Sequence, residues 1–168
     1  MIGTTIGFLV HRSHNIVTKI SNLQKTRYKL SFIKNNIRFF GIQNTFYALF
    51  IANKISSTIA SSLSHLSHRY SEEGETIEYQ KYLNVDYWVL ENVRRAIALG
   101  LHDSEPKRIL DISTGAGFFP YVCRYFGHSV EATDVSENNM YNEIIEIFDI
   151  TRMTLSIEKF KPLKIKHQ

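Results

Sequence analysis

Acidic residues are missing from the first 71 positions of this 168-residue chain, which hold no aspartate and no glutamate. The same stretch carries nine lysines and arginines, whereas the rest of the chain carries eleven against sixteen acidic residues. The net charge of +4 is therefore the sum of +9 and −5. A region with charge of one sign is typical of contact with a polyanion, either nucleic acid or an anionic membrane surface. A second interpretation is an organelle transit peptide, which would be poor in acids, rich in serine and amphipathic. The third is a basic N-terminal extension that is helical or weakly ordered.

Cysteine is nearly absent as well. Cys123 is the only one, so the chain has no disulfide framework. It lies inside a predicted helix, and nothing nearby in the sequence would lower its pKa, which indicates a packed thiol rather than a nucleophile. A single thiol is compatible with a reducing compartment, and we expect the protein to be cytoplasmic.

Long uninterrupted apolar runs are also missing. In the stretch of residues 46–66, Asn53, Lys54 and six serines and threonines break the apolar sequence, so it does not predict a transmembrane helix. Large aliphatic residues recur at every fourth position of this stretch, at Ile51, Ile55, Ile59 and Leu63. The segment therefore predicts an amphipathic helix that packs on a partner or lies at an interface.

The histidines do not indicate a metal site. Two pairs, His11 with His14 and His65 with His68, have a spacing that places two ligands on one helix face. A Zn²⁺ site needs three or four ligands, and no cysteine pair or matching carboxylate completes either pair. We expect no bound metal.

The most informative pattern is a strand, a turn of small residues, a helix, a second strand and an acid. Residues 109–112 form a mostly apolar run that predicts a buried parallel strand. Ser113–Gly117 then forms a turn that lets the backbone pass close to a ligand, and Pro120 suits the first turn of a helix. A second predicted strand, residues 129–133, is followed by Asp134. This order is typical of half of a nucleotide-binding α/β domain, whose acid accepts hydrogen bonds from ribose hydroxyls.

Two details disfavour a dinucleotide as the ligand. The nicotinamide-dinucleotide fingerprint G-x-G-x-x-G needs a third glycine where this chain, counted from Gly115, has Pro120. In addition, Asp111 stands directly before the turn. A carboxylate there would repel a pyrophosphate, but it would attract the ammonium group of an amino-acid-like ligand.

Asp111-Ile-Ser-Thr-Gly-Ala-Gly117 resembles the D/E-x-G-x-G-x-G motif of class I S-adenosylmethionine-dependent methyltransferases. Thr133-Asp134-Val-Ser resembles the second acidic motif of that family. The resemblance implies that S-adenosylmethionine is the cofactor, that Asp111 lies near its methionine portion, and that Gly115 and Gly117 line its backbone. It also implies that Asp134 holds the ribose. Ser113, which we count among the cofactor-binding residues, stands where the family usually has glycine.

The resemblance covers residues 79–163, roughly half of the chain, and implies an α/β fold with a partial Rossmann-like parallel sheet of about three strands. Residues 71–76 are polar, acidic and glycine-containing, and predict a boundary. We therefore expect two regions. Residues 1–70 form a basic, mostly helical or weakly ordered N-terminal region, and residues 71–168 form the N-terminal half of a methyltransferase-like domain.

Apolar spacing predicts the remaining elements. Helices are expected at residues 86–101 and 141–148, and a weak third strand at residues 154–157. In the family, a helix like the first one precedes the first strand and often covers the cofactor cleft. Three aromatic residues near its start therefore either contact ligand or belong to the core: Tyr82, Tyr87 and Trp88.

The pattern stops after the third strand, whereas the family's domain has seven strands and its catalytic motifs largely follow the fourth and later ones. We therefore expect a truncated or degenerate chain in which residues 109–112 form an exposed apolar edge, prone to self-association. No residue is assigned as catalytic. The sequence predicts an S-adenosylmethionine-dependent methyltransferase, as a fragment, with an unknown methyl acceptor. The alternative is a non-catalytic remnant or binding module whose basic N-terminal region contacts a polyanion or a partner chain.

Overall fold

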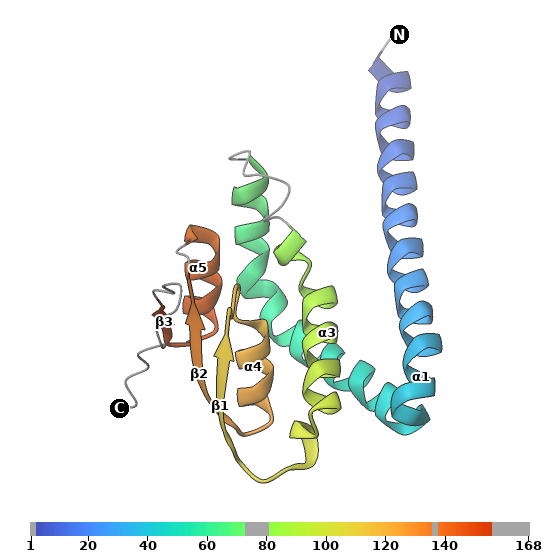
Figure 1. The fold of residues 1–168 in the computed structure, drawn as a ribbon. Helices are drawn as coiled ribbons and strands as arrows, with labels where there is room; N and C mark the ends of the chain where they lie inside the picture. Colours follow the sequence, from blue (N-terminus) through green and yellow to red (C-terminus); the bar gives the residue numbers. More distant parts are fainter. Residues whose placement is uncertain (1–2, 73–80, 136–137, 156–168) are drawn as a thin grey trace. The chain divides into compact units, whose positions relative to one another are not determined.

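The computed structural model of this chain describes residues 3–72, 81–135 and 138–155. Its architecture is mixed α/β with a three-stranded parallel sheet, which confirms the predicted fold class (Figure 1). The chain divides into two compact units, Met1–Phe46 and Tyr47–Gln168. This division falls earlier than the sequence boundary at residue 70, because the segment that follows Tyr47 packs with the α/β part of the chain.

Helix α1 spans Gly3–Glu72 and is interrupted at Gly41, whose φ of 75° and ψ of 168° are not helical. Glycine adopts this positive φ readily because it has no Cβ to clash with the backbone. The Thr45 hydroxyl donates a hydrogen bond of 2.8 Å to the carbonyl of Gly41, which satisfies an acceptor at the break. In the part of the chain that the structure describes, no helix has a stretch long and apolar enough to cross a bilayer.

After Tyr47, α1 buries one face inside the second unit. The exposed fractions of Ile51, Ile55, Ile59 and Leu63 are only 6%, 1%, 4% and 2%. The expectation that this stripe packs on a partner or lies at an interface is wrong, because the chain's own helices cover it. Near the end of α1, for example, the Tyr70 hydroxyl donates a 2.7 Å hydrogen bond to Glu143, far along the chain.

The sheet contains β1 (Arg108–Ile112), β2 (Ser129–Asp134) and β3 (Arg152–Thr154) in the order β1-β2-β3, with both pairings parallel. The first two strands lie where the sequence predicts them. The third begins earlier than predicted, and residues 156–157 of the predicted strand lie outside the described residues. In the register, Asp111 pairs with Ala132, which brings the ends of β1 and β2 together.

Strand β1 forms one edge of the described sheet, and its two faces differ. Asp111 is buried at 4% exposure, whereas the alternate residues Leu110 and Ile112 are 41% and 48% exposed. Successive strand residues point to opposite faces, so one face of β1 is covered and the other is open. The prediction that residues 109–112 form a buried strand is therefore wrong for this face, which the described helices do not cover. As predicted, β1 is an edge strand of the described sheet, while self-association through it stays a prediction.

The helices of the second unit after α1 are α3 (Val85–Ala98), α4 (Phe118–Tyr125) and α5 (Asn139–Ile147), with short 3₁₀ helices η1 (Lys81–Leu83) and η2 (Leu101–Asp103). An asparagine caps the start of both α3 and α5: each side-chain oxygen accepts a hydrogen bond from the backbone N–H three residues later. These caps begin each helix close to its predicted first residue.

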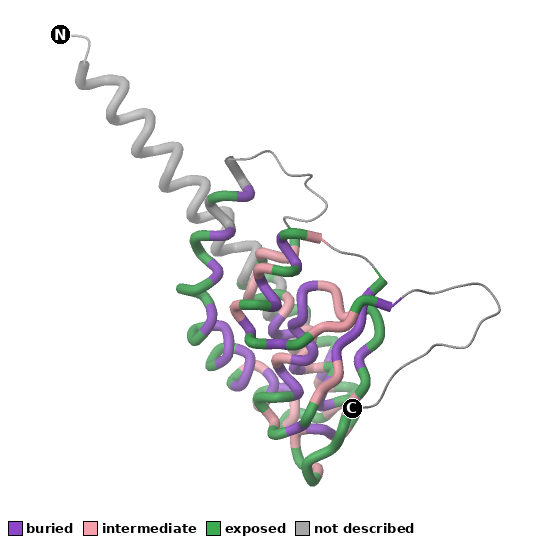
Figure 2. The backbone as a smooth tube through the Cα atoms, turned by 90° about the vertical axis from the view of Figure 1, so that its left-hand side faces the viewer, coloured by how far each residue is buried: buried purple, intermediate pink, exposed green. Residues whose placement is uncertain are grey.

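The core of the second unit forms where these helices meet the sheet and the covered face of α1. Val89 and Val93 of α3 are fully buried, as the predicted apolar spacing requires, and Ile144 of α5 is fully buried as well. In Figure 2 the buried parts of the tube concentrate at the inside of this unit, and exposed residues follow its outer side. The sheet is thus supported on one face by helices of its own chain.

We expect Leu66→Ala to lower the free energy of unfolding of the second unit by about 2–5 kcal/mol, because Leu66 is 1% exposed on the covered face of α1. Leu99→Ala is the matched control, since Leu99 is 58% exposed and its truncation should change stability by less than about 0.5 kcal/mol. Urea denaturation followed by Trp88 fluorescence measures both. Equal effects of the two substitutions would show that α1 does not pack into this core.

Candidate functional site

The turn between β1 and α4 is built from residues with left-handed backbone. Ser113, Gly115 and Gly117 have φ values of 63°, 58° and 80°. The turn is tied to the neighbouring strand by the N–H of Thr114, which donates to the carbonyl of Thr133 at 2.9 Å. The small residues of the motif thus allow a left-handed backbone conformation that larger L-residues adopt only with strain.

The two glycines of the turn have different surroundings. A Cβ on Gly117 would lie 3.0 Å from Ile145 and 3.4 Å from Ile150, so this glycine lets the start of α4 approach α5 and the segment after it. A Cβ on Gly115 would meet nothing within 4 Å. The space beside Gly115 is therefore open, whereas Gly117 serves packing.

Ser113 departs from the family pattern at a position where the backbone favours glycine. At a φ of 63°, the Cβ of Ser113 lies too close to its own backbone, and this strain costs about 1–2 kcal/mol relative to glycine. The side chain is exposed and lines the cavity described below.

Asp111 is a buried carboxylate at the carboxyl end of β1. Its Oδ2 accepts a 2.9 Å hydrogen bond from the Thr114 hydroxyl, and its Oδ1 lies 3.8 Å from the guanidinium of Arg95 on α3. Burial raises the pKa of Asp111 above the usual aspartate value, against the opposing effects of Thr114 and Arg95, and the nearby charge of Asp134 raises it further. Such a carboxylate in a cleft is typical of a functional group.

Asp134 takes part in the turn itself. One of its oxygens accepts a 2.7 Å hydrogen bond from the N–H of Gly115, and the other accepts one of 2.7 Å from the N–H of Val135. The residue is 7% exposed and does not line the cavity. In the structure Asp134 thus links the end of β2 to the glycine turn.

A cavity of about 190 Å³ lies beside Asp111. Its walls combine the turn with charged, polar and aromatic side chains from η1, α3, β1 and α4: Tyr82, Trp88, Asn92, Arg95, Asp111, Ser113, Thr114, Gly115, Ala116, Phe118 and Phe119. Arg95 lies over the Phe119 ring, with 4.0 Å between the guanidinium carbon and the ring centre. An acid, a guanidinium and several aromatic rings therefore meet at one end of the sheet.

Two aromatic residues form one wall of this cavity. The rings of Tyr82 and Trp88 stack with their centres 4.7 Å apart, and the indole N–H of Trp88 donates to the carbonyl of Lys81 at 2.9 Å. Tyr87 packs edge-on against Trp88 with ring centres 5.2 Å apart and does not line the cavity. Of the three aromatic residues singled out in the sequence, two therefore lie at the cavity.

The structure brings three of the five predicted cofactor-binding residues to the cavity: Asp111, Ser113 and Gly115. Gly117 and Asp134 do not line the cavity. Gly117 packs against Ile145, and Asp134 accepts a hydrogen bond from the N–H of Gly115. Arg95 was not identified from the sequence. The predicted helix at residues 86–101 includes it, but periodicity does not show that this arginine lies beside the acid.

Cys123 is fully buried in α4, and burial raises the pKa of its thiol to about 12. The nearby Asp111 carboxylate raises this pKa further, and the charge of Arg95 opposes the increase. A thiol with this pKa stays protonated at neutral pH, so Cys123 is a packing residue and not a nucleophile. Among the described residues, no group of three metal-ligating side chains comes together.

In comparisons with known proteins, no family model matches this chain, and no curated protein or solved structure gives a significant match. The function is therefore inferred from the chemistry of the site and from the resemblance of its motif.

A matched pair of substitutions separates the two roles of glycine in the turn. Gly115→Ala and Gly117→Ala each introduce a Cβ at positive φ, which costs about 1–2 kcal/mol. Gly117→Ala adds a steric conflict with Ile145, for which we expect a further loss of about 1–3 kcal/mol. Chemical denaturation measures the difference, and equal losses would mean that α4 and α5 do not approach closely at this glycine.

The stability of the protein should depend on pH through Asp111. Because the folded state raises this pKa, the folded state binds the proton more tightly than the unfolded chain, and stability is lost as the pH rises through the folded-state pKa. We expect Asp111→Asn, which carries no charge, to be more stable than the parent at neutral pH, with the difference vanishing below about pH 4.

Denaturation midpoints of parent and variant across the acidic range test this expectation. Asp103→Asn is the control, since its carboxylate is 73% exposed and lies away from the cavity. A variant less stable than the parent at neutral pH would contradict the conclusion that the buried, ionised Asp111 destabilises the folded state.

Proposed function

We propose that the cavity beside Asp111 binds the amino-acid end of S-adenosylmethionine, and that this chain is a methyltransferase-like, S-adenosylmethionine-binding protein. One observation carries the proposal. A buried carboxylate and a guanidinium lie 3.8 Å apart at the carboxyl end of a parallel strand, next to a glycine turn with an open side. Ligands of open α/β sheets bind at this end of the strands.

The charges of the site suit a zwitterion. Asp111 accepts hydrogen bonds from an ammonium group, and the guanidinium of Arg95 offers parallel N–H donors to a carboxylate. The Arg95 side chain is 56% exposed, so its guanidinium is accessible to an incoming carboxylate. Binding of the ammonium replaces the solvation that Asp111 lost on burial, which offsets the cost of holding its charge.

The aromatic wall adds a second point of recognition. Tyr82 and Trp88 present stacked rings to the cavity, and a cationic centre is attracted to the face of such rings. In S-adenosylmethionine the sulfonium is such a centre, bonded to the methyl group that is transferred. The cavity volume of about 190 Å³ is below the 300–1,000 Å³ typical of complete small-molecule sites, which supports the amino-acid end as the part that it holds.

Asp134 retains capacity for the role that the family resemblance implies. Each of its oxygens accepts one backbone hydrogen bond in the structure, and a carboxylate offers about four acceptor positions. We propose that the remaining positions accept the ribose hydroxyls while the N–H of Gly115 keeps the carboxylate in place. Methyl transfer itself needs mainly the positioning of two reactants and the exclusion of water, and we assign no catalytic base.

Isothermal titration calorimetry with S-adenosylmethionine tests the proposal. Parent protein and Asp103→Asn should bind it alike, whereas Asp111→Asn should bind about 10- to 100-fold more weakly, as expected for loss of a charged hydrogen bond of about 1.5–3 kcal/mol. Because Asp111→Asn is expected to be the more stable protein, weaker binding is not a result of unfolding. Absence of heat with the parent at millimolar ligand, or unchanged affinity in Asp111→Asn, would contradict the proposal.

A second function is favoured by the charge of α1. No acidic residue precedes Glu72, and five of its cations are described and exposed: Arg27, Lys34, Arg38, Lys54 and Arg69. We propose, as the alternative, a non-catalytic module whose basic helix contacts a polyanion. Salt-sensitive retention on heparin together with no binding of S-adenosylmethionine would favour this function over the first.

A further inference from the structure

The first unit, Met1–Phe46, exposes large apolar side chains along α1. Four of its described residues are 60%, 78%, 62% and 54% exposed: Leu30, Phe39, Ile42 and Phe46. A single exposed apolar side chain is ordinary on a protein surface, but several on one short stretch of a helix mark a surface that meets an apolar partner or a membrane.

Two of these residues share a face of the helix after the break at Gly41. Ile42 and Phe46 are four residues apart, which places them one above the other on a helix. Thr45, between them in the sequence, is only 1% exposed. This stretch therefore has one covered side and one open side, and the open side is apolar.

Three cations share a face of α1 before the same break. Arg27, Lys34 and Arg38 follow one another at intervals of seven and four residues, which return to nearly the same direction on a helix. All three are exposed, whereas Asn36, on the opposite side by helical spacing, is 3% exposed. Leu30 lies three residues after Arg27 and four before Lys34, so an exposed apolar side chain stands on the basic side of the helix.

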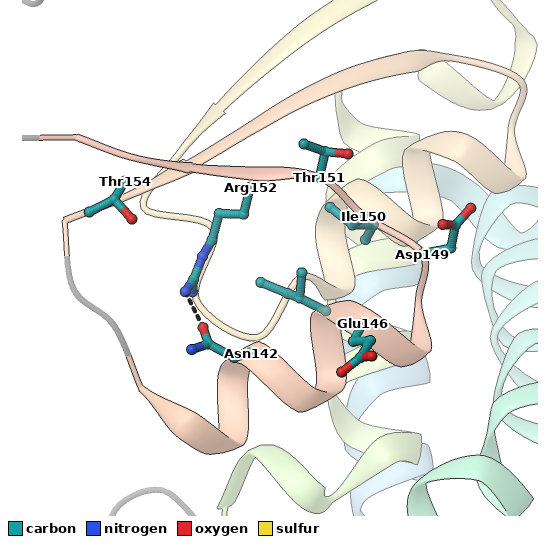
Figure 3. Close-up of a pocket in the computed structure, with 8 residues that line it drawn as sticks. Asn142, Glu146, Asp149, Ile150, Thr151, Arg152 and Thr154 are labelled. Atoms are coloured by element: carbon teal, nitrogen blue, oxygen red, sulfur yellow. Dashed lines mark hydrogen bonds between the residues drawn. The ribbon is translucent and has the colours of Figure 1, made fainter.

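No acidic side chain offsets this charge within the first unit, since the first acid of the sequence is Glu72. In the second unit, by contrast, cations and acids are mixed. Figure 3 shows one case: Arg152 is directed toward α5 and donates to Asn142, and the acids Glu146 and Asp149 line the same cavity. The first unit therefore presents positive charge alone, which attracts an anionic partner.

The combination of exposed cations and exposed apolar side chains selects the kind of partner. Nucleic-acid phosphates would attract the cations, and unpaired bases would stack on Phe39 and Phe46, but neither gives a role to Leu30 and Ile42. A second copy of this unit would bring the same positive charge and be repelled. An anionic bilayer offers both a negative surface potential and an apolar region directly beneath it.

We propose that residues 27–46 of α1 bind the surface of a bilayer that contains anionic lipid. The three cations contact the headgroup phosphates, and the four exposed apolar side chains enter the boundary between headgroups and acyl chains. This inference rests on the basic helix of the alternative function proposed above and names its polyanion. It does not depend on the cavity beside Asp111, which belongs to the second unit.

Cosedimentation of the full-length protein with sucrose-loaded vesicles tests the proposal. Vesicles of phosphatidylcholine and phosphatidylserine in equal amounts should bind the protein at physiological salt at least tenfold more tightly than phosphatidylcholine alone. The reason is that each cation near an anionic surface strengthens binding about fivefold. No binding to the mixed vesicles, or equal binding to both kinds, would overturn the proposal.

Two apolar substitutions test whether side chains enter the bilayer. Phe39→Ser and Ile42→Ser change exposed residues and should each weaken binding to the mixed vesicles about tenfold, because less apolar surface is removed from water. Leu99→Ser is the matched control, since Leu99 is 58% exposed in the second unit, and its binding should stay within twofold of the parent. Unchanged binding in both first-unit variants would show a purely electrostatic contact and contradict the proposal.

A charge substitution tests the basic face in the same assay. Lys34→Gln should weaken vesicle binding about fivefold. Lys107→Gln removes an equally exposed charge from the second unit and should have little effect. Equal losses in the two variants would mean that net charge, and not this face, directs binding.

Heparin and single-stranded DNA separate the failure of this inference from that of the polyanion function. Retention on heparin without vesicle binding would overturn the lipid inference and leave the polyanion function standing, whereas absence of both would overturn both. Single-stranded DNA that binds more tightly than the mixed vesicles, with no loss in Ile42→Ser, would identify a nucleic acid as the partner instead of a bilayer.

Discussion

The parallel pairing of β1 and β2 is the constraint on which the site depends. It places Asp111 opposite Ala132 and so brings two carboxylates, Asp111 and Asp134, to the same end of the sheet. Two carboxylates at short range repel each other. The turn provides each of them with different hydrogen-bond donors. Asp134 is held by the backbone N–H groups of Gly115 and Val135, whereas Asp111 is left with Thr114 and the more distant Arg95.

This division of partners sets the chemistry of the two acids. Asp134 has strong backbone donors and fixes the shape of the turn. Asp111 is buried, and burial raises its pKa, so its ionised form destabilises the fold at neutral pH. Ionisable residues with such shifts are typical of functional sites. A carboxylate kept in this state at the mouth of a small cavity is suited to a cationic group of a ligand, and Arg95 beside it is suited to an anionic one.

The strands at residues 109–112 and 129–133 and the small-residue turn could be predicted because each has a local signal: an apolar run, or residues that tolerate positive φ. Other features depend on tertiary packing and leave no such signal. The four-residue spacing from Ile51 to Leu63 shows a covered face but not what covers it. The glycine motif likewise does not show that Gly117 faces Ile145 rather than a ligand. Arg95 became visible as a residue of the cavity only when separate elements were brought together.

The central claim is that Asp111 is the carboxylate that receives the ammonium group of a ligand. The direct measurement is the pKa of Asp111, followed by ¹³C NMR of its carboxyl group in the free protein and with saturating S-adenosylmethionine. The account predicts a pKa above the usual aspartate value in the free protein and a decrease on binding, because a nearby ammonium favours the ionised carboxylate. Adenosine, which has no amino-acid portion, should not lower it. An Asp111 pKa that stays unchanged with S-adenosylmethionine would contradict the account.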